Sequence, residues 1–355
     1  MPIIPLFGHA GLRDRLAESA LRGTLPSSLL VHGPRGIGKQ RLALWLGSLL
    51  LCGTADAPCG QCANCKLSFE LAHPDLTWVF PRTRDDDGND DSPDEVLGNI
   101  GDAVTERREA HGLYAAPPGN AGIFIGATRS LVREGGRRPA MAKRRVIVVG
   151  EADRMTQGGH EESANAFLKL LEEPPSFTTL ILTSSEPGAL LPTIRSRVVS
   201  VAARPLKDAD VQRFVEHPLV SARLDGASTE STAARVRRAQ GVPGALLNAA
   251  DVAAARENAE RILSAAGGDR AERYRAAFVQ GATGARGAYS DTLDALVLLL
   301  RDRMEGALAK GDARRADAAA RAIPVVLATA EKAAGNAQPS LLTAHLMSAL
   351  QEGSA

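Results

Sequence analysis

The sequence has no apolar run long enough to cross a bilayer, because none reaches the 18 or so uninterrupted residues that a span needs. It also has no surplus of charge, since 42 Lys and Arg against 41 Asp and Glu leave a formal net charge of +1. The first residues, MPIIPLFGHAGLRDRL, lack the basic stretch and long apolar run of a signal peptide. We therefore expect a cytoplasmic protein with no membrane partner, whose contact with nucleic acid must come from a local patch or from other subunits.

Cysteine is scarce and is confined to residues 52–65. The four cysteines have the spacing Cys52-x6-Cys59-x2-Cys62-x2-Cys65. In a reducing compartment this cluster favours a metal over disulfides. Four thiolates brought together by two C-x-x-C turns suit tetrahedral zinc and saturate it, so the sequence predicts a structural zinc ion. Free buried cysteines and a redox pair are the alternatives.

The length and the residue pattern indicate an α/β protein followed by helices. A chain of 355 residues suggests two or three domains, and 44% hydrophobic with 23% charged residues is ordinary for a globular protein. Within residues 1–203, strand-like runs at 28–32, 76–80, 145–149 and 179–183 alternate with helical patterns at 9–22, 41–51 and 162–172. Such apolar runs separated by helices predict a parallel sheet covered on both faces.

Two further segments complete the predicted organisation. Residues 82–120 carry seven acids between Asp85 and Glu95 and are interpreted as a solvated, disordered acidic insert. From about residue 205 the strand-like runs end and helical patterns take over, interrupted by glycines. The sequence thus predicts a small helical domain over residues 204–250 and a separate helical bundle over residues 251–355.

A glycine-rich loop follows the first predicted strand and precedes a helix. In GPRGIGKQ, Gly33, Gly38 and Lys39 fit the G-x-x-x-x-G-K pattern, whose backbone N–H groups surround phosphates while the lysine reaches the terminal ones. The next position should carry the hydroxyl that binds magnesium, but it is Gln40. A glycine turn that serves only the backbone is the alternative interpretation.

The strand at residues 145–149 should end in the acids of a hydrolytic site, an aspartate for magnesium and a glutamate that polarises water. The aspartate position is Gly150, whereas Glu151 keeps the glutamate position. Gln40 and Gly150 together remove both usual protein contacts to magnesium. We therefore predict that hydrolysis has been abandoned, and these losses make binding of ATP and magnesium doubtful.

Several segments together resemble the bacterial clamp-loader family of AAA+ proteins. They are LPSSLLVHGPRGIGK, the CGQCANC cluster followed by His73-Pro74-Asp75, RVIVVGEADRMT, NAFLKLLEEPP and LILTSSEPGALLPTIRSR. The resemblance covers about residues 4–200. It implies an AAA+ domain over residues 1–203, then a helical lid at 204–250 and a helical collar at 251–355. The damaged nucleotide motifs favour a non-hydrolysing member of the family over the gamma/tau motor.

The resemblance also implies roles for individual residues. The family's Ser-Arg-Cys motif falls on Ser196-Arg197-Val198, so Arg197 would be the arginine finger that enters a neighbouring ATP site, although Val198 replaces the cysteine. Ala245 stands where active relatives have a second sensor arginine. The degenerate nucleotide site would comprise Gly33, Gly36, Gly38, Lys39, Gln40, Glu151 and Thr183, the last as the polar sensor.

The implied function is assistance in loading a sliding clamp onto primed template DNA, within a DNA polymerase III complex. The implied partners are the gamma/tau and delta subunits, the clamp and, through the complex, the DNA. An active AAA+ motor of the gamma/tau type is one alternative. A zinc-dependent nucleic-acid-binding module is another, supported by the basic residues Arg133, Arg137, Arg138, Lys143, Arg144 and Arg145. We interpret most of these as a solvated face, with some room for phosphate contacts.

Overall fold

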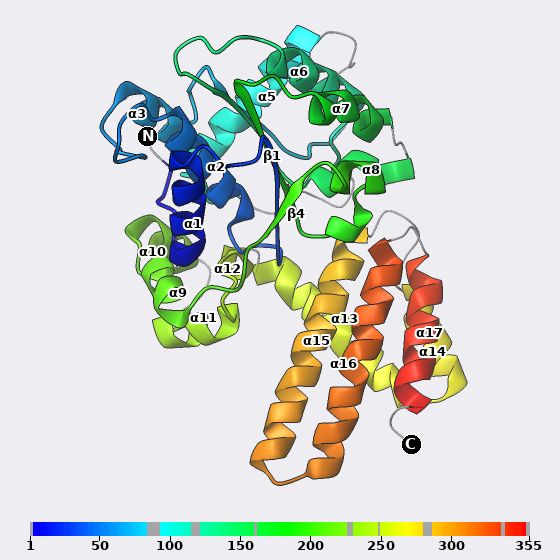
Figure 1. The fold of residues 1–355 in the computed structure, drawn as a ribbon. Helices are drawn as coiled ribbons and strands as arrows, with labels where there is room; N and C mark the ends of the chain where they lie inside the picture. Colours follow the sequence, from blue (N-terminus) through cyan, green and yellow to red (C-terminus); the bar gives the residue numbers. More distant parts are fainter. Residues whose placement is uncertain are drawn as a thin grey trace. The chain divides into compact units, whose positions relative to one another are not determined.

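The computed structural model describes residues 3–83, 93–114, 121–159, 162–225, 230–247, 249–279, 286–334 and 338–352. Contacts divide the chain into two compact units, one ending at Leu247 and the other formed by the residues that follow (Figure 1). The division into three domains at residues 203 and 250 stays a prediction. None of the described helices combines the length and the apolar character that a membrane span requires.

The first unit is built on five parallel strands in the order β2-β3-β4-β1-β5. The strands are β1 (Ser28–His32), β2 (Leu76–Val79), β3 (Arg145–Val149), β4 (Thr178–Ser184) and β5 (Val199–Ala202). The predicted α/β fold with a parallel sheet is confirmed. β5 was not predicted from the sequence, because this short edge strand is mostly exposed and lacks the continuous apolar run of the central strands.

Alternate residues of the strands enter two separate cores, one on each face of the sheet. Ile147 and Val149 of β3 pack in the core that includes residues of α5 (Pro93–Glu109), α6 (Ile125–Gly135) and α7 (Glu162–Glu172). Val146 and Val148 pack in the opposite core, with residues of α1 (Ala10–Leu21) and α2 (Lys39–Leu51) (Figure 1). Helices therefore cover both faces, as the continuous apolar strands predicted.

The prediction of a disordered insert over residues 82–120 is wrong for its described part. Residues 93–109 form α5, which buries Val96 and Ile100 in the core of the sheet, and Leu113 is buried beyond its end. The spacing of four residues between Val96 and Ile100 places both on one helical face. Acidic residues before and within this segment obscured that pattern in the sequence. The rest of the predicted insert, residues 84–92 and 115–120, lies outside the described part.

Short elements complete the sheet region, and small helices follow it. The first set is α3 (Ala63–Phe69), the 3₁₀ helices η1 (Ala152–Gly159) and η2 (Pro187–Ala189), and α8 (Pro192–Arg195). After β5 come α9 (Asp208–Val215), α10 (Pro218–Asp225), α11 (Thr232–Ala239) and α12 (Gly244–Leu247). Val211, Phe214 and Leu246 form their core together with Ile4 from the start of the chain. These contacts make the small helices part of the first unit.

The second unit is helical in its described part. It consists of α13 (Ala249–Ala266), α14 (Arg270–Val279), α15 (Arg286–Ala309), α16 (Ala313–Ala334) and α17 (Pro339–Glu352). Ile262, Leu296, Val326 and Leu346 are fully buried at its centre. Its helical character agrees with the pattern read from the sequence.

Candidate functional site

The four cysteines converge as the sequence predicted. All four sulfur atoms lie within 4.8 Å of one another, with 3.9 Å between the Sγ atoms of Cys52 and Cys62 and 4.0 Å between those of Cys59 and Cys65. Tetrahedral zinc with Zn–S bonds of about 2.3 Å requires sulfurs about 3.8 Å apart. The donor set therefore fits a closed zinc site.

The pKa values of the thiols differ within the cluster. Hydrogen bonds from the backbone N–H groups of Cys62 and Gln61 lower the pKa of Cys59 to about 6. Burial, by contrast, raises the pKa of Cys65 to about 12. A dication bound between the sulfurs would supply the positive charge needed to hold such different thiols together as thiolates.

Hydrogen bonds connect the cysteine cluster to the sheet through Asn64, which lies between two of the cysteines. Its Nδ2 donates to the carbonyl of Leu51 at the end of α2 (2.8 Å), and its Oδ1 lies 3.1 Å from His73 Nε2. His73 Nδ1 in turn accepts the N–H of Asp75, immediately before β2 (3.0 Å). The His73-Pro74-Asp75 segment, which served only as a family marker in the sequence, thus joins the cluster to the first strand after it.

The glycine-rich loop joins β1 to α2 as predicted. Its glycines with positive φ are Gly33 (153°), Gly36 (83°) and Gly38 (94°). Lys39 is buried, and its ammonium group donates to the carbonyls of Gly33 and Pro34 (2.9 Å each) and to Ser185 Oγ (2.8 Å). The lysine that would reach a nucleotide's terminal phosphates is therefore held by the loop itself and by the residue after β4.

The small helices also contact this loop through backbone. The N–H of Gly244 donates to the carbonyl of Gly36 (2.9 Å), and a Cβ added at Gly244 would lie 2.6 Å from Gly36 Cα. Only glycine tolerates so close an approach. Ala245, the next residue, provides no positive charge at the position of the second sensor.

Gln40 and Gly150 are in direct contact, so the two departures from the nucleotide-binding pattern form one feature. A Cβ added at Gly150 would lie 2.4 Å from Gln40 Oε1. The same oxygen accepts hydrogen bonds from Trp78 Nε1 (3.1 Å) and Arg107 Nη1 (3.4 Å). The carboxamide of Gln40 thus occupies the space into which an aspartate at residue 150 would extend.

Arg107 brings a buried cation to this point from α5. Its guanidinium carbon lies 3.2 Å from the ring centroid of Phe80, 3.8 Å from that of Tyr114 and 4.8 Å from that of Trp78. Burial lowers the pKa of Arg107 to about 10, which still leaves it charged at neutral pH. Arg107 could not be recognised from the sequence, because the acids of its segment predicted a disordered insert.

Glu151 and Thr183, two other predicted site residues, also meet. The backbone N–H of Glu151 donates to Thr183 Oγ1 (3.0 Å), and Glu151 has a φ of 48°. The Glu151 carboxylate forms an ion pair with Arg154 Nε at 3.2 Å. Both residues are buried at the ends of β3 and β4, where their described contacts hold the two strands and η1 together.

Arg197 lies apart from this group, after α8. Its Nη2 is 2.7 Å from Glu172 Oε1, and its Nη1 donates to the carbonyl of Thr193 (2.9 Å). The side chain is 34% exposed, whereas Val198 beside it is buried. Arg197 is therefore at the surface, in contact with Glu172 at the end of α7 and with Thr193 in α8.

The basic stretch is not one solvated face. Arg145 is buried and forms ion pairs with Glu134 (3.0 Å) and Asp75 (3.5 Å). A solvated position is therefore wrong for Arg145, because its side chain neutralises these two carboxylates in the interior. Arg138, Lys143 and Arg144 are exposed.

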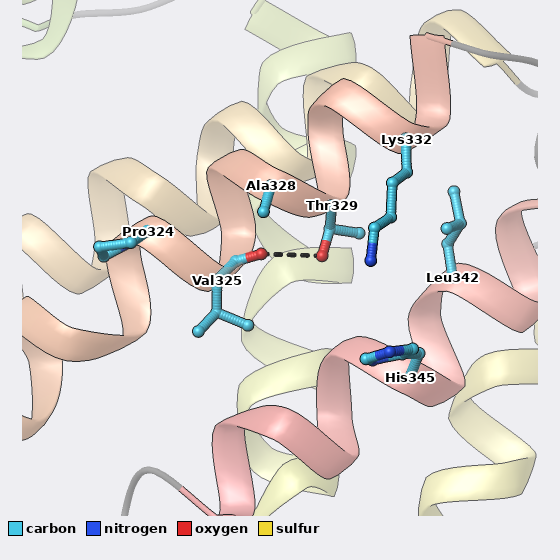
Figure 2. Close-up of a pocket in the computed structure, with 7 residues that line it drawn as sticks. All are labelled: Pro324, Val325, Ala328, Thr329, Lys332, Leu342 and His345. Atoms are coloured by element: carbon cyan, nitrogen blue, oxygen red, sulfur yellow. Dashed lines mark hydrogen bonds between the residues drawn. The ribbon is translucent and has the colours of Figure 1, made fainter.

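A groove in the second unit is lined by few reactive side chains. It lies between α16 and α17, has a volume of about 320 Å³, and is lined by Pro324, Val325, Ala328, Thr329, Lys332, Leu342 and His345 (Figure 2). The Thr329 hydroxyl donates to the carbonyl of Val325 within its own helix (2.8 Å). The titratable groups along this lining are one lysine and one histidine, so we do not assign a reactive site there.

Comparison with known proteins identifies the family. The family model described as DNA polymerase III, delta subunit, matches residues 8–207, more than half of the chain. The chain belongs to this family.

The particular member that the chain resembles is delta-prime. The delta' subunit of Pseudomonas aeruginosa is 30% identical over 237 residues, covering 61% of this chain and 59% of that protein. The delta' subunit of Bacillus subtilis is 27% identical over 203 residues, covering 57% and 49%. The chain thus spans less than two thirds of the length of these relatives. A gamma subunit-related protein of Thermotoga maritima has 15% identity and a TM-score of 0.41, with 97% of this chain and 99% of that chain covered.

The purified protein is expected to contain about one zinc ion per chain, because the four sulfurs form a complete tetrahedral set. Metal analysis of protein purified with its thiols protected tests this. The Cys59→Ser, Cys62→Ser double variant should lose the metal and provides the control. Chelation should unfold the cluster and leave the sheet, so global loss of circular dichroism on chelation would contradict a locally structural role.

Substitutions at residues 40 and 150 should be strongly non-additive. Gly150→Asp alone introduces a side chain against the Gln40 carboxamide, and we expect it to destabilise the fold by about 1–3 kcal/mol. With Gln40→Thr present, the same aspartate should cost less, because the space has been vacated and Arg107 offers it a cation. Denaturant unfolding of the two single variants and the double variant measures the coupling. Additive free energies of unfolding would show that the two residues do not compete for space.

Proposed function

We propose that this chain is the non-hydrolysing delta-prime subunit of a DNA polymerase III clamp loader, acting in the cytoplasm. With the gamma/tau and delta subunits it helps to load the sliding clamp onto primed template DNA. The proposal is supported by the family match and by relatives named as delta' subunits. The observation that carries the non-hydrolysing role is the contact between Gln40 and Gly150, with Arg107 beside it.

The chemistry of hydrolysis requires magnesium between the phosphates and two protein groups. Here the positions expected to supply those groups are Gln40 and Gly150, and the guanidinium of Arg107 lies beside Gln40. A second cation close to a buried guanidinium would be repelled by it. Lys39 would also have to leave its three hydrogen bonds to reach a phosphate. The residues at this site therefore oppose both magnesium binding and catalysis.

The contribution of this chain to catalysis would come from Arg197. An arginine directed at a neighbouring subunit's γ-phosphate stabilises the charge that spreads over its oxygens in the transition state. The position of Arg197 after the short helix α8, with part of its side chain exposed, is compatible with this role. To act in trans, Arg197 must exchange Glu172 for the phosphate. An exposed ion pair of this kind is worth about 0–1 kcal/mol, so the exchange is energetically accessible.

The isolated chain is expected to show no sustained ATP turnover. Phosphate release from the pure protein measures this, with Lys39→Ala as the comparison. Both proteins should give the same background. Turnover by the parent chain that Lys39→Ala abolishes would overturn the non-hydrolysing role and would favour the alternative of an active motor of the gamma/tau type.

In a complex reconstituted with its gamma/tau and delta partners, Arg197→Ala should remove catalysis at the one ATP site that it serves. An arginine finger is worth roughly 10³–10⁵ in rate at its own site, so total turnover should fall only partly while clamp loading falls more. Arg197→Lys should rescue poorly, because lysine lacks the planar fork of donors.

The matched control for Arg197 is Arg195→Ala, an exposed arginine two residues earlier in α8. Assembly of each variant is checked by gel filtration. Equal ATPase and equal clamp loading for the parent and Arg197→Ala complexes would show that Arg197 is an ordinary surface residue.

A further inference from the structure

The connection between α6 and β3 is a loop held by one buried carboxylate. Asp75, which is fully buried, accepts hydrogen bonds from three consecutive backbone N–H groups, those of Ala140 (2.6 Å), Met141 (2.8 Å) and Ala142 (2.7 Å). Burial opposes the ionisation of Asp75, but these donors and then Arg145 hold its pKa below the usual value. Hydrogen bonds to a charged acceptor are about twice as strong as neutral ones, so the backbone of this loop has a fixed conformation.

The exposed side chains of this loop are mainly cations. Arg137, Arg138, Lys143 and Arg144 are exposed. Glu134, an acid close to them, already bonds to Arg137 (2.7 Å) and Arg145 (3.0 Å). Within the described part of the chain, Arg138, Lys143 and Arg144 form no ion pair. The loop therefore presents three uncompensated positive charges on a rigid backbone.

We propose that this basic loop, residues 137–144, binds the phosphodiester backbone of nucleic acid. Phosphate contacts need spaced cations and no particular base edges, and releasing counterions from the nucleic acid drives binding. An acidic protein partner would be expected to bury an apolar centre as well. Met141 is the one large apolar side chain of the loop, 46% exposed, which favours the polyanion. The inference rests on the proposed function in one respect: a clamp-loader subunit would work close to DNA.

The fixed backbone of this loop supports the proposal independently of the loop's net charge. Ordering a flexible loop on binding would cost conformational entropy, about 1–2 kcal/mol for each residue fixed. Asp75 has already ordered residues 140–142 between the cations at 138 and 143. The cations are therefore presented with part of that entropy already lost in folding.

The test is fluorescence anisotropy with the full-length chain across a range of salt concentrations. The probes are a short labelled DNA duplex, a labelled single strand of the same length and labelled polyglutamate. We expect both nucleic acids to bind in a salt-dependent manner, and the triple variant Arg138→Gln, Lys143→Gln, Arg144→Gln to bind more weakly. Each lost phosphate contact should reduce the slope of log K against log salt on duplex by about 0.9, so by about 2.7 for three contacts.

The matched control removes the same charge elsewhere in the first unit, through Arg204→Gln, Lys207→Gln and Arg237→Gln, which are also exposed. Its slope should equal that of the parent chain. A second variant, Asp75→Asn, keeps all the cations but weakens their anchor, so it should lower affinity without changing the slope. Thermal unfolding shows whether it folds, and if it does not, the triple variant decides alone.

Equal salt slopes for the triple variant and its control would overturn the proposal. Binding of polyglutamate as tight as that of the oligonucleotides, and equally sensitive to the triple variant, would also overturn it in favour of an acidic protein partner. Because this assay uses the isolated chain and no ATP, its failure leaves the arginine-finger experiment unaffected. Failure of the arginine-finger experiment would likewise leave the result of this binding assay unaffected.

Discussion

The hydrogen bonds from Trp78 and Arg107 to Gln40 Oε1 fix the arrangement of side chains at the predicted nucleotide site. A buried guanidinium is stable only where its charge is compensated, and here three aromatic rings and a carboxamide oxygen surround it. The carboxamide can take that position because residue 150 has no side chain. The glycine at residue 150 and the presence of Gln40 are therefore one packing solution, in which Gln40 also accepts a hydrogen bond from a buried cation of α5.

A second set of polar contacts joins the cysteine cluster to the sheet and then to the basic loop. Asn64 connects the cluster to His73, the N–H of Asp75 binds His73, and the Asp75 carboxylate holds residues 140–142. Buried polar groups must be satisfied, so each of these contacts constrains the next. A structural metal at the cysteines would fix the start of the helix that carries Asn64, from which this series of hydrogen bonds begins.

The features that could be predicted from the sequence are those that depend on neighbours along the chain. The apolar strands 28–32 and 145–149, the glycine loop and the spacing of the cysteines are all local signals, and the structure has each of them. Helix α5 was missed because acids lie among and before its apolar residues. The contact of Gln40 with Gly150 joins residues more than 100 positions apart, so the sequence could show two losses but not that one side chain accounts for both.

The hydrogen bonds of Lys39 give the glycine-rich loop a structural role that needs no ligand. Its three hydrogen bonds tie the loop after β1 to Ser185 after β4, two neighbouring strands of the sheet. Removing a buried ammonium group would leave these acceptors without a partner, at a cost of about 1–3 kcal/mol for an unsatisfied buried group. Stability alone is therefore a sufficient reason for this loop to keep Lys39. The retained G-x-x-x-x-G-K pattern is thus compatible with the proposed non-hydrolysing role.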